Sequence, residues 1–407
     1  MTGPTRSRNI HPESFTFTVL IGALTALPSL ATDMSLPALD GIARALHASP
    51  GEAALTLSLF LVGYALAPIA FGPLSDEYGR RPVVIAGCAL FALAAILGTF
   101  AGSIPMLLLW RLLQGAGAGA GTVISFAVVR DLFDGAGLRR RLAQISIVRV
   151  IAPMVGPSLG AFVLPFGGWR GIYALTALLA TLLLAAAILR LAESAPRFSG
   201  RPHVPVRLIT AYARVLRNRA CLGYSLVNAC AFGCLFGYIN GSSLVMIGVL
   251  GVSPRLFGLL FALVDMGLLA GFFLNGRLNA WGIGRHAPLL AGLWLSAAAS
   301  LALLALSLAG MTRLPGLVSL LLLAAFGYGL VTPNATQGAL QPLPEVAGVA
   351  AAVLSLLMML TGAFSGMIVS ALFDGRTALA MTGVMAAFSA GALALYLAFV
   401  RPAERAR

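Results

Sequence analysis

The chain has 407 residues, of which 59% are apolar and only 10% are charged, and its mean hydropathy is +0.95. Soluble domains carry about 25% charged residues, so this composition excludes a soluble globular protein and places most of the chain in a lipid bilayer. The net charge of +14 is spread over short loops between apolar stretches, so it does not indicate a nucleic-acid-binding domain.

Twelve apolar stretches follow one another along the chain, each near the ~20 residues that cross a hydrocarbon core of ~30 Å. They predict an all-α membrane protein with twelve transmembrane helices in two six-helix bundles. The expected spans are 14–37, 53–74, 82–102, 105–129, 142–165, 169–190, 220–248, 255–275, 286–309, 315–338, 346–373 and 377–400.

The longest polar stretch, 191–219, contains several prolines and arginines and is predicted to be a linker between an N-terminal bundle, 1–190, and a C-terminal bundle, 220–407. Paired six-helix halves are a known transporter architecture. Of the 27 basic residues, all of them arginine, twenty fall in one set of loops and five in the opposite set. The positive-inside rule then predicts that both termini are cytoplasmic. No cleavable signal peptide is expected, because the first apolar run is too long and contains Asp33.

Among the charged residues inside predicted spans, three are candidates for function: Asp33 in the first, Arg111 in the fourth and Asp265 near the middle of the eighth. Arg149 in the fifth is near the cytoplasmic end and is expected to be structural. A charge at membrane depth costs at least ~2.5–3.5 kcal/mol on insertion scales, so it usually faces the bundle interior or a water-filled path. Structural alternatives remain at this stage. The alternative for Arg111 is a purely structural role in which it ties helices together. The alternative for Asp33 is that it caps a helix at the membrane interface.

The loop after the second span reads Gly72-Pro-Leu-Ser-Asp-Glu-Tyr-Gly-Arg-Arg-Pro82. It resembles the signature loop of the major facilitator superfamily, which holds the two halves together on the cytoplasmic side. The resemblance implies that Asp76 faces the start of the eleventh span near Gly348, where the positive end of a helix favours a carboxylate. Asp131 is a plausible partner for Arg80. The residues that the resemblance assigns to this latch loop and its partner are Gly72, Asp76, Gly79, Arg80, Arg81 and Asp131.

Two further motifs carry the resemblance. Span four, Leu107 to Gly119, resembles the superfamily's fourth-helix motif, whose buried arginine maps to Arg111 and takes part in proton coupling. Its small residues from Gly115 to Gly121 favour close helix contact.

Span five is similar to the antiporter motif that marks exporters, with Ala152 and Ala161 in place of the outer glycines. The alternative is an ordinary kinked packing helix. Its matching residues are Pro153, Gly156, Pro157 and Gly160.

The stretches 31–39, 129–133 and 346–352 narrow the resemblance to the Bcr/CflA branch of drug:proton antiporters, nearly end to end. This implies a monomeric, proton-coupled efflux transporter of the bacterial inner membrane that moves small amphipathic organic molecules by alternating access, with Asp33 at the branch's first-helix aspartate. The alternatives are a proton-coupled importer of a small metabolite, which the span-five motif disfavours, and a non-transporting membrane receptor.

Side chains that are aromatic, amide or thioether groups on cavity-facing spans are candidates for the substrate pocket, since such pockets are mostly apolar with few polar groups. They are Tyr64, Gln114, Phe232, Phe236, Asn240, Tyr328 and Met358. No Walker A loop, metal-ligand set or nucleophile–base pair is found in the sequence. We therefore expect no cofactor, no metal and no enzymatic activity.

Overall fold

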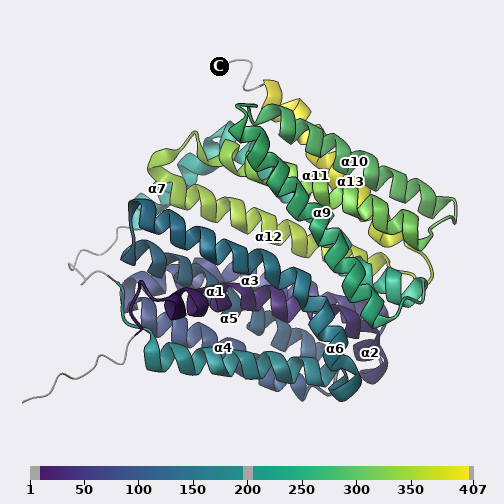
Figure 1. Ribbon diagram of the computed structural model, residues 1–407, viewed down its shortest axis with the longest axis horizontal. Helices are drawn as coiled ribbons and strands as arrows, with labels where there is room; N and C mark the ends of the chain where they lie inside the picture. Colours follow the sequence, from purple (N-terminus) through teal and green to yellow (C-terminus); the bar gives the residue numbers. More distant parts are fainter. Residues whose placement is uncertain (1–9, 196–204, 403–407) are drawn as a thin grey trace, which may run out of the picture.

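The computed structural model describes residues 10–195 and 205–402, and within these ranges the secondary structure is entirely helical (Figure 1). The predicted linker is therefore described only in part, and Arg6, Arg8, Arg197, Arg201, Arg405 and Arg407, which contribute to the predicted orientation, lie outside the described residues. The helices of the N-terminal half are α1 (Phe15–Asp33), η1 (Leu36–Ala38), α2 (Leu39–Ala45), α3 (Pro50–Tyr78), α4 (Arg80–Thr99), α5 (Ile104–Leu132) and α6 (Gly135–Arg190).

The remaining helices form the C-terminal half, preceded by a short amphipathic helix, α7, which packs on α8 and α12. They are α7 (Pro205–Arg217), α8 (Arg219–Ser243), η2 (Leu244–Val249), α9 (Pro254–Ala280), α10 (His286–Leu308), α11 (Leu314–Leu340), η3 (Pro344–Val346), α12 (Ala347–Leu372), α13 (Leu379–Leu395) and η4 (Tyr396–Val400).

The number of spans depends on how α6 is counted. Eleven described helices are long and apolar enough to cross a membrane when α6 is taken as one. At ~1.5 Å per residue its 56 residues would be about twice as long as a bilayer requires. The backbone at Gly168 is non-helical, with φ 60° and ψ −158°, and divides α6 into two spans. The predicted fold class, with twelve spans, is confirmed.

The first span differs from its predicted bounds, 14–37, because α1 ends at Asp33. Pro37 lacks the N–H that would continue the helix by donating to the Asp33 carbonyl. The Ser35 hydroxyl instead donates to the Thr32 carbonyl at 2.6 Å, and the chain continues through η1 into α2. All of η1 and the residues Leu39, Ile42 and Ala43 of α2 are buried, so the aspartate lies at a helix end that is covered by protein.

Small residues allow the helices within each half to pack closely. A methyl group placed on Gly115 of α5 would lie 1.9 Å from the Phe60 carbonyl oxygen of α3, and one on Gly271 of α9 would lie 2.3 Å from the Phe326 carbonyl oxygen of α11. No side chain larger than hydrogen fits at either crossing. The glycine stripe of the fourth span therefore brings α5 against α3, as the sequence predicts.

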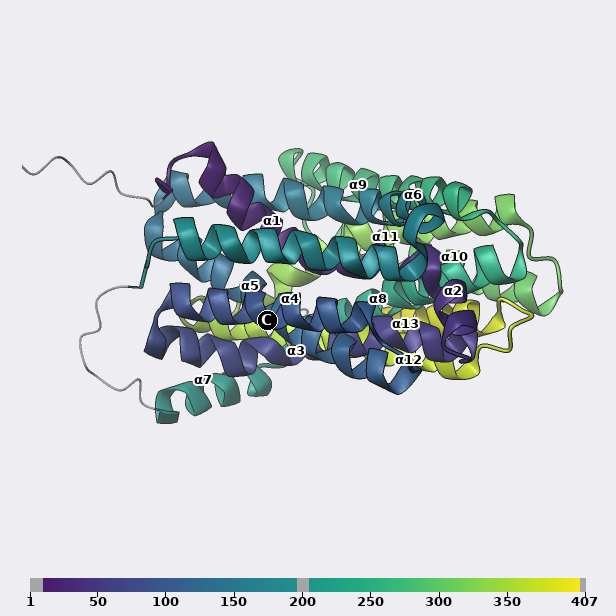
Figure 2. The ribbon, with the colours of Figure 1, turned by 90° about the horizontal axis from the view of Figure 1, so that it is seen from below.

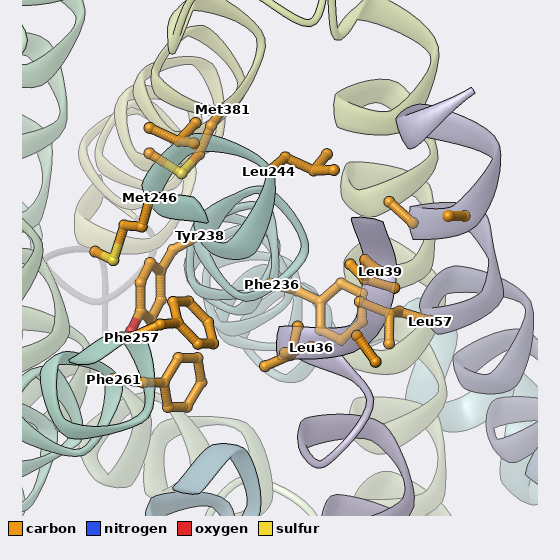
Figure 3. Packing of buried hydrophobic residues seen from close by; sticks show 14 of the residues in the cluster. Leu36, Leu39, Leu57, Phe236, Tyr238, Leu244, Met246, Phe257, Phe261 and Met381 are labelled. Carbon is orange, nitrogen blue, oxygen red and sulfur yellow. The ribbon is translucent and has the colours of Figure 1, made fainter. Parts of the chain in front are cut away.

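The two halves meet mainly at one end of the bundle. We call the end where α1 begins and α7 lies the linker end, and the opposite end the far end (Figure 2). A buried apolar cluster at the far end draws on both halves, with Leu36, Leu39 and Leu57 lying against Phe236 and neighbouring residues of the C-terminal half (Figure 3). Among the described residues, each apolar cluster at the linker end comes from one half alone.

Polar contacts confirm that the far end is closed. The Ser243 hydroxyl donates to the Leu36 carbonyl at 2.5 Å, and the Asn240 amide donates to the Ala54 carbonyl at 3.1 Å. Along their lengths, α3 contacts α12 and α6 contacts α9, and these helix pairs also join the halves. The structure is therefore a conformation with its halves packed together at the far end.

Candidate functional site

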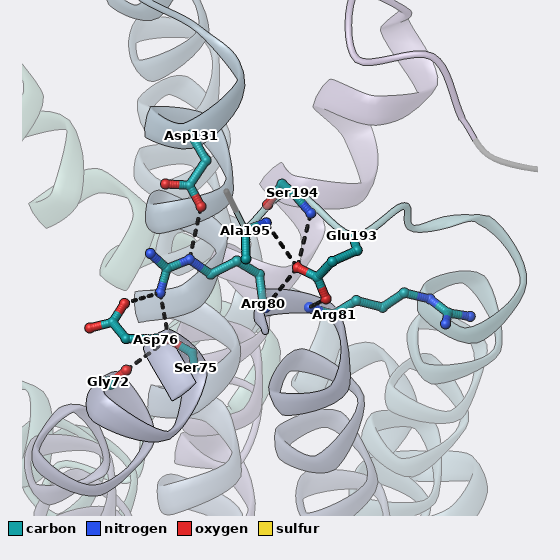
Figure 4. A network of polar contacts seen from close by, with 9 residues as sticks. All are labelled: Gly72, Ser75, Asp76, Arg80, Arg81, Asp131, Glu193, Ser194 and Ala195. Atoms are coloured by element: carbon teal, nitrogen blue, oxygen red, sulfur yellow. Dashed lines mark hydrogen bonds and ion pairs between the residues drawn. The ribbon is translucent and has the colours of Figure 1, made fainter. Parts of the chain in front are cut away.

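The latch loop, residues 72–82, forms a charge network centred on Arg80 (Figure 4). Arg80 Nε donates to Asp131 Oδ2 at 2.8 Å, so the predicted pairing is present. Arg80 Nη1 donates to Ser75 Oγ at 2.8 Å and also pairs with Asp76. Gly79, with φ 98°, supplies the left-handed turn between α3 and α4 that brings these groups together.

Asp76 does not make its expected contact with the start of α12. Its side chain is 59% exposed and pairs with Arg80, while a methyl group placed on Gly348 would have no heavy atom within 4 Å. The expectation that Asp76 faces Gly348 is wrong for this conformation. The reason is geometric, because the halves are packed together at the far end and these two residues lie at the linker end.

Glu193 is part of this network and was not identified from the sequence. Its carboxylate accepts the backbone N–H groups of Arg80 at 2.8 Å and Arg81 at 3.1 Å, and those of Ser194 and Ala195 at 2.9 Å each (Figure 4). It thus caps the N-terminus of α4, where a carboxylate is favoured. The first residues of the predicted linker therefore hold the latch loop in place. No local sequence pattern indicates this contact, because its two partners are more than 110 residues apart in the chain.

Arg111 is buried, with 1% of its surface exposed, and it ties three helices together. Its Nε donates to the Thr56 carbonyl at 3.3 Å, and its Nη1 donates to the Ala31 carbonyl at 3.2 Å and to Gln114 Oε1 at 2.9 Å. The guanidinium lies over the Phe60 ring at 4.6 Å, and its Nη2 is buried without a hydrogen-bond partner. A buried cation with one free donor is placed to attract an anionic group.

Asp33, at the end of α1, and Asp265, in α9, lie on opposite sides of the boundary between the halves. Both side chains are buried, at 5% and 7% exposure, and their carboxylates are close enough to repel each other electrostatically. Arg111 attracts Asp33, but among the described residues neither carboxylate lies within 4.0 Å of an arginine nitrogen. Asp265 Oδ2 and the nearby Tyr238 hydroxyl are buried without partners. This group of residues therefore places ionisable side chains without an ion-pair partner inside the helix bundle, which is the kind of site where a membrane protein handles protons or substrate.

The antiporter motif packs directly on Asp33. A methyl group on Gly156 would lie 2.8 Å from Asp33 Cβ, and one on Gly160 would lie 2.0 Å from the Met34 carbonyl oxygen. Pro153 and Pro157 lie in the same part of α6. Ser158, between the two glycines, contacts Gly258 of α9 in the other half. The motif thus lies between the end of α1 and the C-terminal half.

Gly160→Ala is expected to force α6 away from α1 and to abolish transport, because the new methyl group has no space. Overpacking of this kind costs about 1–3 kcal/mol, so the melting temperature of the purified protein should fall by several degrees. Gly121→Ala in α5 is the matched control, since a methyl group there meets nothing within 4 Å. Wild-type transport by Gly160→Ala would contradict the packing argument.

The predicted pocket residues do not all lie together. Phe232 lies between Phe236 and Tyr328, with ring centroids 6.0 and 6.4 Å away. Asn240 is fully buried and bonds to the Ala54 carbonyl, Ser58 and Ser370, so here it joins the halves. The other three are placed as follows: Gln114 accepts from Arg111, Tyr64 is partly buried against two apolar clusters, and Met358 accepts from Asn228.

A described cavity shares Tyr328 but lies inside the C-terminal half. Its apolar lining comes from α8, α10, α11 and α13, including Tyr238, Leu293 and Met385. It is therefore not the space between the halves.

The twelve-span fold, the two packed halves and the charges at their boundary define a multi-pass membrane transporter. The family model described as Major Facilitator Superfamily matches residues 21–366, and the chain belongs to that family. The predicted family is confirmed.

Similar proteins agree with this assignment. The chain is 31% identical to the uncharacterized MFS-type transporter YdgK of Bacillus subtilis over 92% of both chains. It is 29% identical to a bicyclomycin resistance protein homolog of Haemophilus influenzae, over 89% of this chain and 91% of that one. It is 28% identical to the multidrug resistance protein D of Escherichia coli over 85% of both. These names support the predicted Bcr/CflA-type branch.

Solved structures show the same fold. An inward-facing, occupied bacterial homologue of the lysosomal transporter Spinster superposes with a TM-score of 0.74 at 17% identity, over 98% of both chains. A D-xylose-proton symporter superposes with a TM-score of 0.68 at 16% identity, over 95% of this chain and 98% of that one.

Proposed function

We propose that the chain is a proton-coupled exporter of small organic molecules that works by alternating access. The observation that carries the proposal is the contact between the antiporter motif and Asp33. Arg111 is bonded to the same helix, α1, through the Ala31 carbonyl. The names of the relatives, which include a chloramphenicol resistance protein of Pseudomonas aeruginosa that is 30% identical over 82% of this chain and 79% of that one, support export.

The orientation follows from the arginines in the loops. With the linker end in the cytoplasm of a bacterial cell and the protein in the inner membrane as a monomer, the closed far end is periplasmic. The conformation is then inward-facing. The two halves, 1–190 and 220–407 with the linker 191–219 between them, would rock about their boundary to open the far end.

Asp33 and Asp265 are the groups we assign to proton handling, with Arg111 as the fixed positive charge beside them. When the far end opens, the carboxylates reach the periplasm and take up a proton, which weakens their hold on a cationic or polar substrate. When it closes, the proton is released towards the cytoplasm.

The energy is sufficient for useful export. One proton moving through ~100 mV yields ~2.3 kcal/mol, and each pH unit adds ~1.4 kcal/mol. Together, at one pH unit, they support a gradient of roughly a few hundred-fold for an uncharged substrate.

Everted membrane vesicles test the proposal. Vesicles that contain the protein should accumulate chloramphenicol or ethidium when energised, and a proton uncoupler should remove the accumulation. An importer would instead release substrate from energised everted vesicles, and a receptor would move none. Either result would refute export.

A further inference from the structure

One face of α8 leads from the closed far end towards the linker end. Asn228, Phe232, Phe236 and Asn240 are spaced four residues apart, so successive members are neighbours on the helix surface and form a stripe that winds slowly around α8. At the far end this face contacts the other half, since Asn240 donates to Ser58 of α3 at 3.3 Å.

Phe232 lies where this side of α8 meets the other half. A methyl group on Gly362 of α12 would lie 2.5 Å from the Phe232 ring and 3.1 Å from Leu61 of α3. One helical turn further towards the linker end, the hydrogen bonds of Asn228 go only to its own half.

The Asn228 amide is buried and only partly satisfied. Its Nδ2 donates to Thr336 Oγ1 at 3.2 Å and to Met358 Sδ at 3.3 Å, and its Oδ1 is buried without a partner. An unsatisfied buried acceptor costs ~1–3 kcal/mol, and a thioether is a weak acceptor. The bond to Met358 is therefore readily exchanged for a bond to a better partner.

The cover over this amide is flexible and uncharged. Met358 and Thr336 are each partly exposed, whereas Asn228 behind them is fully buried. Methionine side chains rearrange readily because they are unbranched. Phe232 lies one turn away along α8, and the ring of Tyr328 on α11 is 6.4 Å from its ring.

We propose that Asn228 is the recognition residue for uncharged substrates that carry an amide or hydroxyl group on an aromatic body. The ligand displaces Met358, donates to Asn228 Oδ1 and accepts from Nδ2, while its ring packs against Phe232 and Tyr328. Cations use Asp33 and Asp265 instead, so the two classes of substrate are bound by different side chains. This inference rests on the proposed function.

Direct binding to purified full-length protein tests it with two probes. Chloramphenicol is uncharged and has amide and hydroxyl groups, whereas tetraphenylphosphonium is a cation without any hydrogen-bonding group. Asn228→Leu should weaken chloramphenicol binding about 5- to 150-fold, corresponding to the ~1–3 kcal/mol of an unsatisfied polar group. It should leave tetraphenylphosphonium binding within about twofold.

Two further variants separate recognition from folding. Met358→Leu removes the competing thioether and should strengthen chloramphenicol binding, a gain that a damaged fold cannot produce. Asn334→Leu is the matched control, because Asn334 is a buried amide of the same half that bonds to Asn275 on α9. It should affect both probes equally.

Equal losses for the two probes in Asn228→Leu would overturn the inference, as would wild-type protein that does not bind chloramphenicol. Because binding is measured without transport, the result is independent of the vesicle experiment. Failed export with selective loss in Asn228→Leu would refute the proposed function and leave the binding site standing.

Discussion

Asp33→Asn is expected to abolish proton-driven accumulation in everted vesicles while the protein remains in the membrane. The amide keeps the shape of the side chain but cannot bind and release a proton, so uphill export loses its energy source. Downhill flux of preloaded substrate should persist, because the halves can still rock. The measurement is uncoupler-sensitive accumulation, normalised to the amount of protein in the vesicles.

The matched control is Asp40→Asn. Asp40 follows Asp33 by seven residues but is exposed and pairs with Arg44 at 2.7 Å, so its loss should leave accumulation unchanged. Arg111→Ala is expected to behave like Asp33→Asn, with an added loss of stability because the carbonyls of Ala31 and Thr56 lose their donor. Normal uncoupler-sensitive export by both Asp33→Asn and Arg111→Ala would refute the assignment.

Features that depend on neighbouring residues in the chain were predictable. Hydrophobic length gave the twelve spans, and the small-residue stripe from Gly115 to Gly121 correctly indicated a close helix crossing. The end of α1 was placed too late, because the span was set by apolar length and not by the missing N–H of Pro37.

Features that depend on tertiary packing were not predictable from spacing. Glu193 caps α4 from beyond the sixth span, and Asn228 carries no motif that separates it from an ordinary buried amide. Asp265 was singled out by its depth, but only the packing of the halves brings it opposite Asp33. The contact of Asp76 with α12 depends on the conformation, which a sequence does not specify.

The charge moved in each transport cycle is expected to distinguish the two classes of substrate. Asp33, Asp265 and Arg111 together carry one net negative charge when both carboxylates are ionised. We expect Asp33 alone to exchange its proton in each cycle, so one proton moves for each substrate molecule. Exchange of one proton for one monovalent cation is then electroneutral and is driven only by the pH difference, at ~1.4 kcal/mol per unit.

An uncharged substrate would instead move one net positive charge inward per cycle and respond to the membrane potential as well. Valinomycin with potassium, which collapses the potential and preserves the pH difference, should slow chloramphenicol transport in everted vesicles and spare that of the monovalent cation ethidium. If ethidium transport proves equally sensitive to the potential, more than one proton moves per cycle. Asp265 is then a separate carrier, because its carboxylate is the other buried acid at the boundary of the described halves, and Asp265→Asn should restore electroneutral exchange of ethidium.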